Sequence, residues 1–330
     1  MLLAATPGLA AALEDRPRRD VELTLPLPAR AADPVRLASA RSLLGAAART
    51  GALGPYVLLS DVDDAALLGR AHRLAETIEA SYVERYGLVP VGRARESTVL
   101  FAREAGYRAF QRLEPRLAEF QGASGLAESG LVATFVGERP SDEILATLTH
   151  EWVHLLNRRA IGPALPSWLE EGMADDLSTS AIDDAGRLRL GSWSRILTPR
   201  PAGWKIAGGE ASLRELVGAL ETPPNPAGGE RFDFESALML DWREFAGSDR
   251  APLHYATANA FLRWILADEE LRPLARGWLA EVAAGAPAEL DSLRAALALP
   301  WAEIAPRLTG WLAGELTRLP ALPPPAPNSD

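Results

Sequence analysis

Two kinds of hydrophobic pattern alternate along the first 137 residues of the chain. Short apolar runs, bounded by polar or turn-forming residues, predict strands at 21–27, 56–60, 97–102 and 131–136. Segments whose apolar side chains recur at helical spacing predict helices at 34–49, 65–86 and 105–120. We therefore expect residues 21–137 to form an α/β lobe built on a mixed sheet.

From residue 141 onward the pattern is mostly helical, and it contains no strong strand signal before the C-terminus. Helical periodicity predicts helices at 142–158, 168–178, 211–220, 254–267, 270–284, 288–298 and 301–317. The stretch 181–210 is rich in Gly, Pro and Trp and predicts a loop with short strands, and 222–229 predicts a surface loop. The expected fold class is α+β, with a helical lobe over residues 138–318.

The two ends of the chain differ from both lobes. Residues 1–20 begin with an apolar stretch, Met1 to Leu13, that lacks the basic start of a signal peptide. This segment is therefore either the end of a leader or a disordered N-terminus. Its apolar character favours export to the periplasm or cell envelope, and the alternative is a cytoplasmic protein. Residues 319–330 are proline-rich and predict a disordered tail.

Composition narrows the function classes. The 330 residues carry a formal net charge of −10, which disfavours binding to nucleic acid or anionic lipid. The absence of cysteine excludes disulfides, thiolate metal ligands and a cysteine nucleophile. No uninterrupted apolar run approaches the length of a membrane span.

The clearest chemical signal is the motif H-E-x-x-H at His150, Glu151 and His154. Side chains four residues apart lie on one face of a helix, so both imidazoles can reach one metal ion. Ser141 is a plausible N-cap for this helix, with Asp142 in its first turn. The alternative is an ordinary helix with two hydrogen-bonded histidines, but burying these groups without a metal would be costly.

A catalytic zinc site needs a third protein ligand and one open position. A third histidine of the extended motif is absent, because Asn157 and Ala160 stand at the required places. In the next predicted helix, Ser167 and Glu170 fit an S-x-x-E capping box, in which Glu170 folds back onto the helix start. Glu171, about 100° further round the helix, is then the side chain that faces the metal.

Asp175 lies four residues after Glu171, on the same helix face. A carboxylate there can accept a hydrogen bond from the far ring nitrogen of His150 or His154 and so fix its tautomer. The competing interpretation of Asp175 is a solvated aspartate on an exposed helix surface.

H-E-x-x-H followed by P-x-W-L-x-E-G-x-A resembles the gluzincin metallopeptidases, in particular the bacterial peptidase-MA-like domains and the aminopeptidase N-like enzymes. The resemblance is specific over residues 141–176 and weaker over 56–110 and 255–265. It implies a zincin-like fold and one zinc ion held by His150, His154 and Glu171, with Glu151 as catalyst.

The resemblance also directs attention to the strand before the motif helix. In gluzincins the corresponding strand is the sheet edge, where an extended peptide could add by backbone hydrogen bonds. Residues 130–137 occupy this place without the glutamate that aminopeptidases use for the free amine, which puts aminopeptidase action in doubt. The competing interpretation of the apolar strand 131–136 is a position in the sheet interior.

The chemistry expected of such a site is metal-assisted hydrolysis of a peptide or protein substrate, with Glu151 as general base. The tetrahedral oxyanion needs a donor besides the metal. His254 and Tyr255 are the candidates, and the resemblance favours Tyr255, whose alternative role is core packing. Two other functions remain open: a non-catalytic binding or scaffold protein of the same fold, and a metal-dependent hydrolase of a non-peptide amide or ester.

Overall fold

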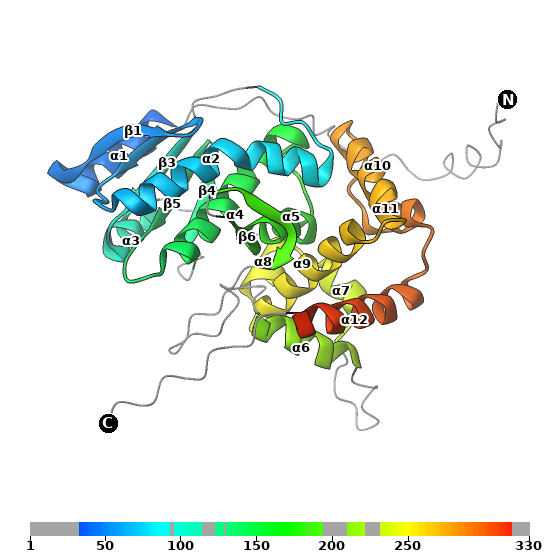
Figure 1. Ribbon diagram of the computed structural model, residues 1–330. Helices are drawn as coiled ribbons and strands as arrows, with labels where there is room; N and C mark the ends of the chain where they lie inside the picture. The colour runs from blue at the N-terminus through cyan, green and yellow to red at the C-terminus, as the bar shows by residue number, and fades with distance from the viewer. Residues whose placement is uncertain are drawn as a thin grey trace, which may run out of the picture.

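The computed structural model describes residues 33–92, 96–113, 123–128, 130–183, 185–193, 210–221 and 232–318. These residues form a mixed α+β structure with a five-stranded sheet at one end and a mainly helical part at the other (Figure 1). The expected α+β class with a mixed sheet is confirmed. Among the described helices, none is long and apolar enough to cross a membrane. The expectations for 1–20, 21–27, 222–229 and 319–330 concern segments outside the described residues.

The sheet has the strand order β1-β2-β3-β5-β4. Its three central strands, β2 (Tyr56–Ser60), β3 (Ser97–Phe101) and β5 (Leu131–Phe135), are parallel and almost wholly buried, which explains why they appear as short apolar runs. The two edge strands, β1 (Arg49–Leu53) and β4 (Gly125–Glu128), are antiparallel to their neighbours. Both escaped prediction because they contain Gly and Ala and lack a run of β-branched residues.

Of the two interpretations of strand 131–136, the position in the sheet interior is confirmed and the sheet edge is wrong. β5 pairs with β3 on one side and with β4 on the other, so β4 is the edge. The chain reverses tightly between Glu128 and Leu131, where Gly130 has a φ of +76° that favours glycine. This turn folds the preceding residues back onto β5 and places them outside it.

Helices cover both faces of the sheet (Figure 1). The helices α2 (Ala65–Tyr86) and α4 (Ser141–Ala160) pack on one face and share the larger hydrophobic core with the helical part. On the other face, α1 (Pro34–Leu44) and α3 (Glu104–Arg112) enclose a smaller core. Because α4 lies over β4 and β5, the helix with the H-E-x-x-H motif runs beside the sheet edge.

One of the predicted helices ends earlier than expected, and another is described only in part. The helix predicted over 34–49 stops at Leu44, where Gly45 takes a φ of +66°; a 3-10 turn (Gly45–Ala47) and strand β1 follow. The helix predicted over 105–120 is described only as far as Arg112, and residues 114–120 lie outside the described ranges.

The helical part is centred on α5 (Ser167–Ser178) and α9 (Ala251–Ala267), which pack against each other. A hairpin of β6 (Ser180–Ile182) and β7 (Leu188–Trp193) follows α5. Short strands were predicted in this part of the chain, within 181–210. The remaining helices are α6 (Glu210–Glu221), α7 (Phe234–Met239), α8 (Trp242–Gly247), α10 (Leu271–Ala283), α11 (Leu290–Leu297) and α12 (Trp301–Arg318). The short helices α7 and α8 were not predicted, because six residues are too few to show helical periodicity.

A buried ionic cluster ties α5 to the helices on either side of it. Asp176, on α5, accepts hydrogen bonds from Arg85 Nε of α2 at 2.7 Å and from Arg263 Nε of α9 at 3.0 Å. Tyr86 also donates its hydroxyl to Asp176, at 3.1 Å. Burial alone would raise the pKa of Asp176, but the two guanidinium groups outweigh it and lower the pKa. The cluster therefore fixes α5 in position from within the core.

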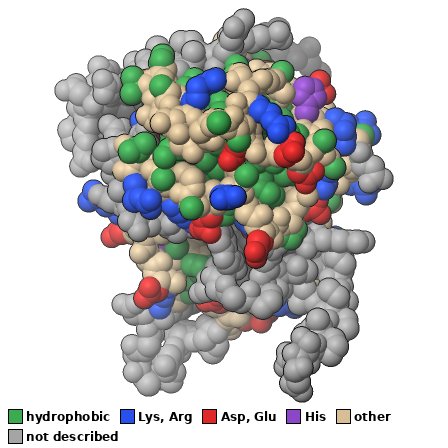
Figure 2. Space-filling view, turned by 90° about the vertical axis from the view of Figure 1, so that its left-hand side faces the viewer, with side chains coloured by type: hydrophobic (Ala, Val, Ile, Leu, Met, Phe, Trp, Pro, Cys, Tyr) green, Lys and Arg blue, Asp and Glu red, His purple; other side chains and the backbone are tan. Residues whose placement is uncertain are grey.

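Charged side chains are mixed over the face of the molecule drawn in Figure 2. Basic and acidic groups lie close to one another there, with hydrophobic and neutral atoms between them, and form no continuous field of one sign. Elsewhere in the described residues, exposed charges also pair with the opposite sign, as Arg49 does with Asp63. This face offers no extended basic surface of the kind that nucleic acid binding requires.

Candidate metal centre

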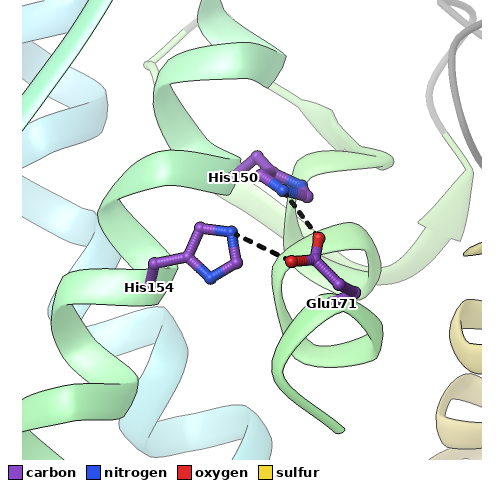
Figure 3. A group of neighbouring side chains, drawn as sticks. All are labelled: His150, His154 and Glu171. Atoms are coloured by element: carbon purple, nitrogen blue, oxygen red, sulfur yellow. Dashed lines mark ion pairs between the residues drawn. The ribbon is translucent and has the colours of Figure 1, made fainter. Parts of the chain in front are cut away.

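The candidate site lies between α4 and α5. α4 carries His150 and His154 one turn apart, and α5 carries Glu171 in its second turn. Figure 3 shows the two imidazoles and the carboxylate directed toward one common place between the helices. Ser141 is the first residue of α4 and makes no capping hydrogen bond, so its expected N-cap role is wrong; Pro140 precedes the helix instead.

The three side chains approach one another closely enough to share one ion. His150 Nε2 lies 3.2 Å from Glu171 Oε2, and His154 Nε2 lies 3.7 Å from Glu171 Oε1. One ligand atom from each residue can be chosen so that all lie within 4.8 Å of one another. Two atoms bound tetrahedrally to zinc at about 2.0 Å are separated by about 3.3 Å, so these spacings suit zinc.

Each imidazole has a second carboxylate near its other nitrogen. His150 Nδ1 forms a hydrogen bond of 2.9 Å with Asp175 Oδ1, as expected for Asp175. His154 Nδ1 lies 3.3 Å from Glu170 Oε1. When each Nδ1 carries the hydrogen, each Nε2 presents its lone pair to the space shared with Glu171.

Sequence reasoning assigned the wrong role to Glu170. The expected capping box is absent, since Pro166 precedes α5 and no side chain caps the helix start. Glu170 instead turns toward His154, because α5 runs close alongside α4 and offers its first turns to the motif histidines. The adjacent pair Glu170 and Glu171 therefore contacts both nitrogens of His154. Two adjacent glutamates in the sequence were the available signal, but the S-x-x-E capping pattern suggested a different role for Glu170.

Electrostatics around the histidines are dominated by these carboxylates. Burial alone would lower the pKa of His150, but the nearby carboxylates of Asp175 and Glu171 outweigh it and raise the pKa well above the usual range. For His154, burial is again the largest effect, and Glu171 and Glu170 together raise its pKa in spite of it. The pocket thus strongly favours a positive charge at the place where the imidazoles meet, which a bound cation would supply.

The donor set and its surroundings fit a zinc ion. Two imidazole nitrogens and one carboxylate oxygen form the ligand set of many catalytic zinc sites. Glu171 Oε2 is buried and makes no hydrogen bond, so this oxygen is available to a cation. Of the residues that the structure describes, His150, His154 and Glu171 are the only such group of potential ligands.

Glu151 lies beside this group and faces the sheet edge. A Cβ added to Gly125 of β4 would lie 2.5 Å from Glu151 Oε1, so the carboxylate lies directly against that strand. Burial raises the pKa of Glu151; His150 and His154 oppose the shift, and Glu171 adds to it. Gly125 was not predicted, because no pattern in the neighbouring sequence indicates that a glycine leaves space for a side chain far away in the chain.

The two candidate oxyanion donors differ in their surroundings. Tyr255, on α9, packs against Phe245 with ring centroids 5.0 Å apart. Burial, followed by the charges of Glu171, Asp175 and other site carboxylates, raises the pKa of Tyr255, so its hydroxyl stays protonated near the site. His254 is also buried, and its Nδ1 lies 3.0 Å from the carbonyl oxygen of Phe245. That contact directs the His254 ring toward α8.

No known protein family pattern matches this chain, and no curated protein is significantly similar to it in sequence.

Proposed function

We propose that this protein is a zinc-dependent peptidase of the gluzincin type, with a zincin-like fold around the motif helix. The observation that carries the proposal is the convergence of His150, His154 and Glu171 from two adjacent helices, with Glu151 between them and the sheet edge. A purely structural zinc site would close its fourth position with another ligand and would have no use for a buried, uncoordinated glutamate.

The residues of the chain divide the proposed reaction among them. A zinc ion held by His150, His154 and Glu171 would polarise the scissile carbonyl and lower the pKa of a water molecule. Glu151 takes the proton of that water as it attacks the carbonyl carbon, and later delivers it to the leaving amine. Its raised pKa suits a group that must both accept and return a proton near neutral pH. The protonated hydroxyl of Tyr255 donates a hydrogen bond to the oxyanion.

The substrate of the proposed reaction is an extended peptide or protein segment. The edge strand β4 passes directly beside Glu151 at Gly125, so a segment paired with β4 would bring its backbone to the general base. The Cβ-free position is required here because any larger side chain would occupy the space of the Glu151 carboxylate. Such backbone pairing is available to peptides and excludes most small amides.

The decisive experiment combines metal analysis with one substitution. The purified protein should contain about one zinc per chain and cleave casein or a peptide library, and a chelator should abolish the cleavage. Glu151→Gln should retain zinc while its kcat falls by about 10²- to 10⁴-fold, because the general base is lost. Glu281→Gln, on the exposed side of α10, is the matched control and should cleave like wild type. Absence of both zinc and cleavage, or equal cleavage by Glu151→Gln, would refute the proposal.

A further inference from the structure

The backbone of β4 presents alternate residues to its free edge. Val136 N–H bonds to Phe101 of β3, and Gly130 accepts from Ser97 of β3, so the even-numbered residues of β5 turn toward β3. The odd-numbered residues of β5 must then pair with β4, through Leu126 and Glu128 in the observed register. It follows that Gly125 and Ala127 direct their N–H and C=O groups away from β5, toward the free edge.

One of these outward groups already has a side chain bound to it. Arg158 Nη2, from the last turns of α4, donates a hydrogen bond of 3.1 Å to the Ala127 carbonyl oxygen. The same guanidinium nitrogen lies 3.8 Å from Glu128 Oε2. Arg158 therefore occupies the position from which the N–H of an added strand would reach Ala127. The other outward groups are the N–H and C=O of Gly125 and the N–H of Ala127, for which no partner lies among the described residues.

Arg158 belongs to the same face of α4 as the motif histidines. It follows His154 by one turn and His150 by two turns, and its charge acts on both Glu151 and Glu170. Ala127, Glu128 and Arg158 are each partly exposed, whereas Gly125 is buried against Glu151. The edge thus runs from a buried position at the general base to a solvent-accessible position that the guanidinium closes.

We propose that Arg158 limits the length of peptide that can pair with β4, so that the site accepts a chain end or a short peptide on that side of the scissile bond. This inference rests on the proposed peptidase function, because that function makes a peptide the molecule that pairs with β4. A segment paired opposite Gly125 reaches Glu151, and its continuation past Ala127 meets the guanidinium instead of a free carbonyl. Arg158 is in this view a specificity-determining residue.

Peptide binding to a protein that cannot turn over tests this directly. The zinc-loaded Glu151→Gln protein is titrated by calorimetry with two series of alanine–serine peptides, from about two to eight residues, one lengthened at the N-terminus and one at the C-terminus. We expect the affinity in the series that grows toward Arg158 to stop rising after the first few residues. In the Glu151→Gln protein that also carries Arg158→Ala, the affinity in this series should rise further with length, by about tenfold. That factor corresponds to one additional backbone hydrogen bond of about 1.4 kcal/mol.

Two controls separate this effect from general damage. Arg158→Lys keeps a positive charge and a donor, and should retain most of the length limit. Arg294→Ala removes an exposed arginine far from the site in the fold and should leave both series unchanged. Affinity that rises with length in both series of the parent protein, an unchanged profile in Arg158→Ala, or no peptide binding at all would overturn the inference.

The two proposals fail in different ways. If wild type cleaves peptides but Arg158→Ala leaves the length profile unchanged, the length limit is refuted and the peptidase stands. If wild type cleaves nothing while the Glu151→Gln protein binds short peptides with the expected limit, the peptidase is refuted and the role of Arg158 stands.

Discussion

Each motif imidazole lies between two carboxylates, and this arrangement determines what the side chain can do. On His150 the partners are Asp175 at Nδ1 and Glu171 at Nε2, and on His154 they are Glu170 and Glu171. A carboxylate at Nδ1 fixes the ring orientation and makes Nε2 a stronger ligand. The two outer carboxylates should therefore contribute to metal affinity without touching the metal.

We predict that Asp175→Asn and Glu170→Gln each weaken zinc binding by about 10- to 100-fold, because each imidazole loses the negative charge beside its Nδ1. Competition against a fluorescent zinc chelator measures the dissociation constants. The isosteric amides keep the side-chain volume, and Glu281→Gln serves as the unaffected comparison. Unchanged zinc affinity in both variants would show that the outer carboxylates serve only to pack α5 against α4.

The residue scale also shows where sequence reasoning succeeded and failed. His150, Glu151 and His154 were identified from the H-E-x-x-H motif, and Glu171 from the helix geometry and the resemblance; the structure brings the three expected ligands together. Glu170 was misassigned because a capping box depends only on local positions, whereas its contact with His154 depends on the packing of two helices. Gly125 was missed for the same reason, since its neighbour Glu151 is distant in the sequence.

At the scale of single elements, the edge strand β4 limits the space around Glu151, the proposed general base. Gly125→Ala would place a methyl group 2.5 Å from Glu151 Oε1 and 2.8 Å from Thr147 Cγ2, so the Glu151 carboxylate must move. We predict that kcat falls by about 10- to 100-fold while zinc content stays at the wild-type level, as expected for a misplaced base. Steady-state kinetics with metal analysis checks both quantities.

Gly277→Ala is the matched comparison for this substitution. A Cβ at Gly277 on α10 would meet no atom within 4 Å, so activity should not change and helix stability should rise slightly. Full activity in Gly125→Ala would mean that Glu151 does not need its present position against β4.

The start of β3 carries a pH-sensitive contact with the end of α4. Glu96 is buried, and burial raises the pKa of its carboxyl to about 7; Arg159, whose Nη1 lies 3.7 Å from Glu96 Oε2, opposes the shift, and Glu79 adds to it. The folded state therefore holds a proton at Glu96 that the unfolded chain releases near pH 4.5. Because the native state binds more protons between these values, its stability falls as the pH rises from about 4.5 to 7.

Glu96→Gln should remove this loss of stability, because a neutral amide pays no cost of ionisation in a buried site. Relative to wild type, we predict that its free energy of unfolding rises between pH 5 and pH 8 by on the order of 2 kcal/mol. Urea denaturation at both pH values measures the difference, with the exposed Glu281→Gln as reference. Parallel stability curves for Glu96→Gln and wild type would contradict the prediction.

At the scale of the whole molecule, the buried cluster around Asp176 joins the sheet-side helix α2 to α5 and α9. Arg85 is 8% exposed, Arg263 1% and Asp176 is wholly buried, so one carboxylate compensates two guanidinium groups inside the protein. Arg263 is further held by the Asp176 carbonyl at 2.6 Å and lies over the Trp193 ring at 3.9 Å. The helix that carries Glu171 thus depends on contacts from both parts of the fold.

We predict that Asp176→Asn destabilises the protein by about 3–5 kcal/mol, because it leaves two buried cations without their counter-charge. Asp291→Asn, which breaks an exposed ion pair with Arg294, should cost less than about 0.5 kcal/mol. Thermal and urea unfolding of the metal-free proteins measures both effects. A small loss for Asp176→Asn would show that water or the neighbouring backbone can replace the carboxylate.

The sequence alone determined the helices with strong periodicity, the three buried central strands and the residues of the H-E-x-x-H motif, because these signals lie within one element or one turn. Only the tertiary structure decided which strand forms the sheet edge, that Glu170 turns to His154, and that Gly125 and Arg158 flank the edge beside Glu151. Those features depend on strand order and on helices packed against each other, and hydrophobic periodicity carries no information about either. The pattern of hydrophobic and polar positions specifies whether a segment forms a helix or a strand. The turns between segments and the packing of helices and strands determine which segments come into contact.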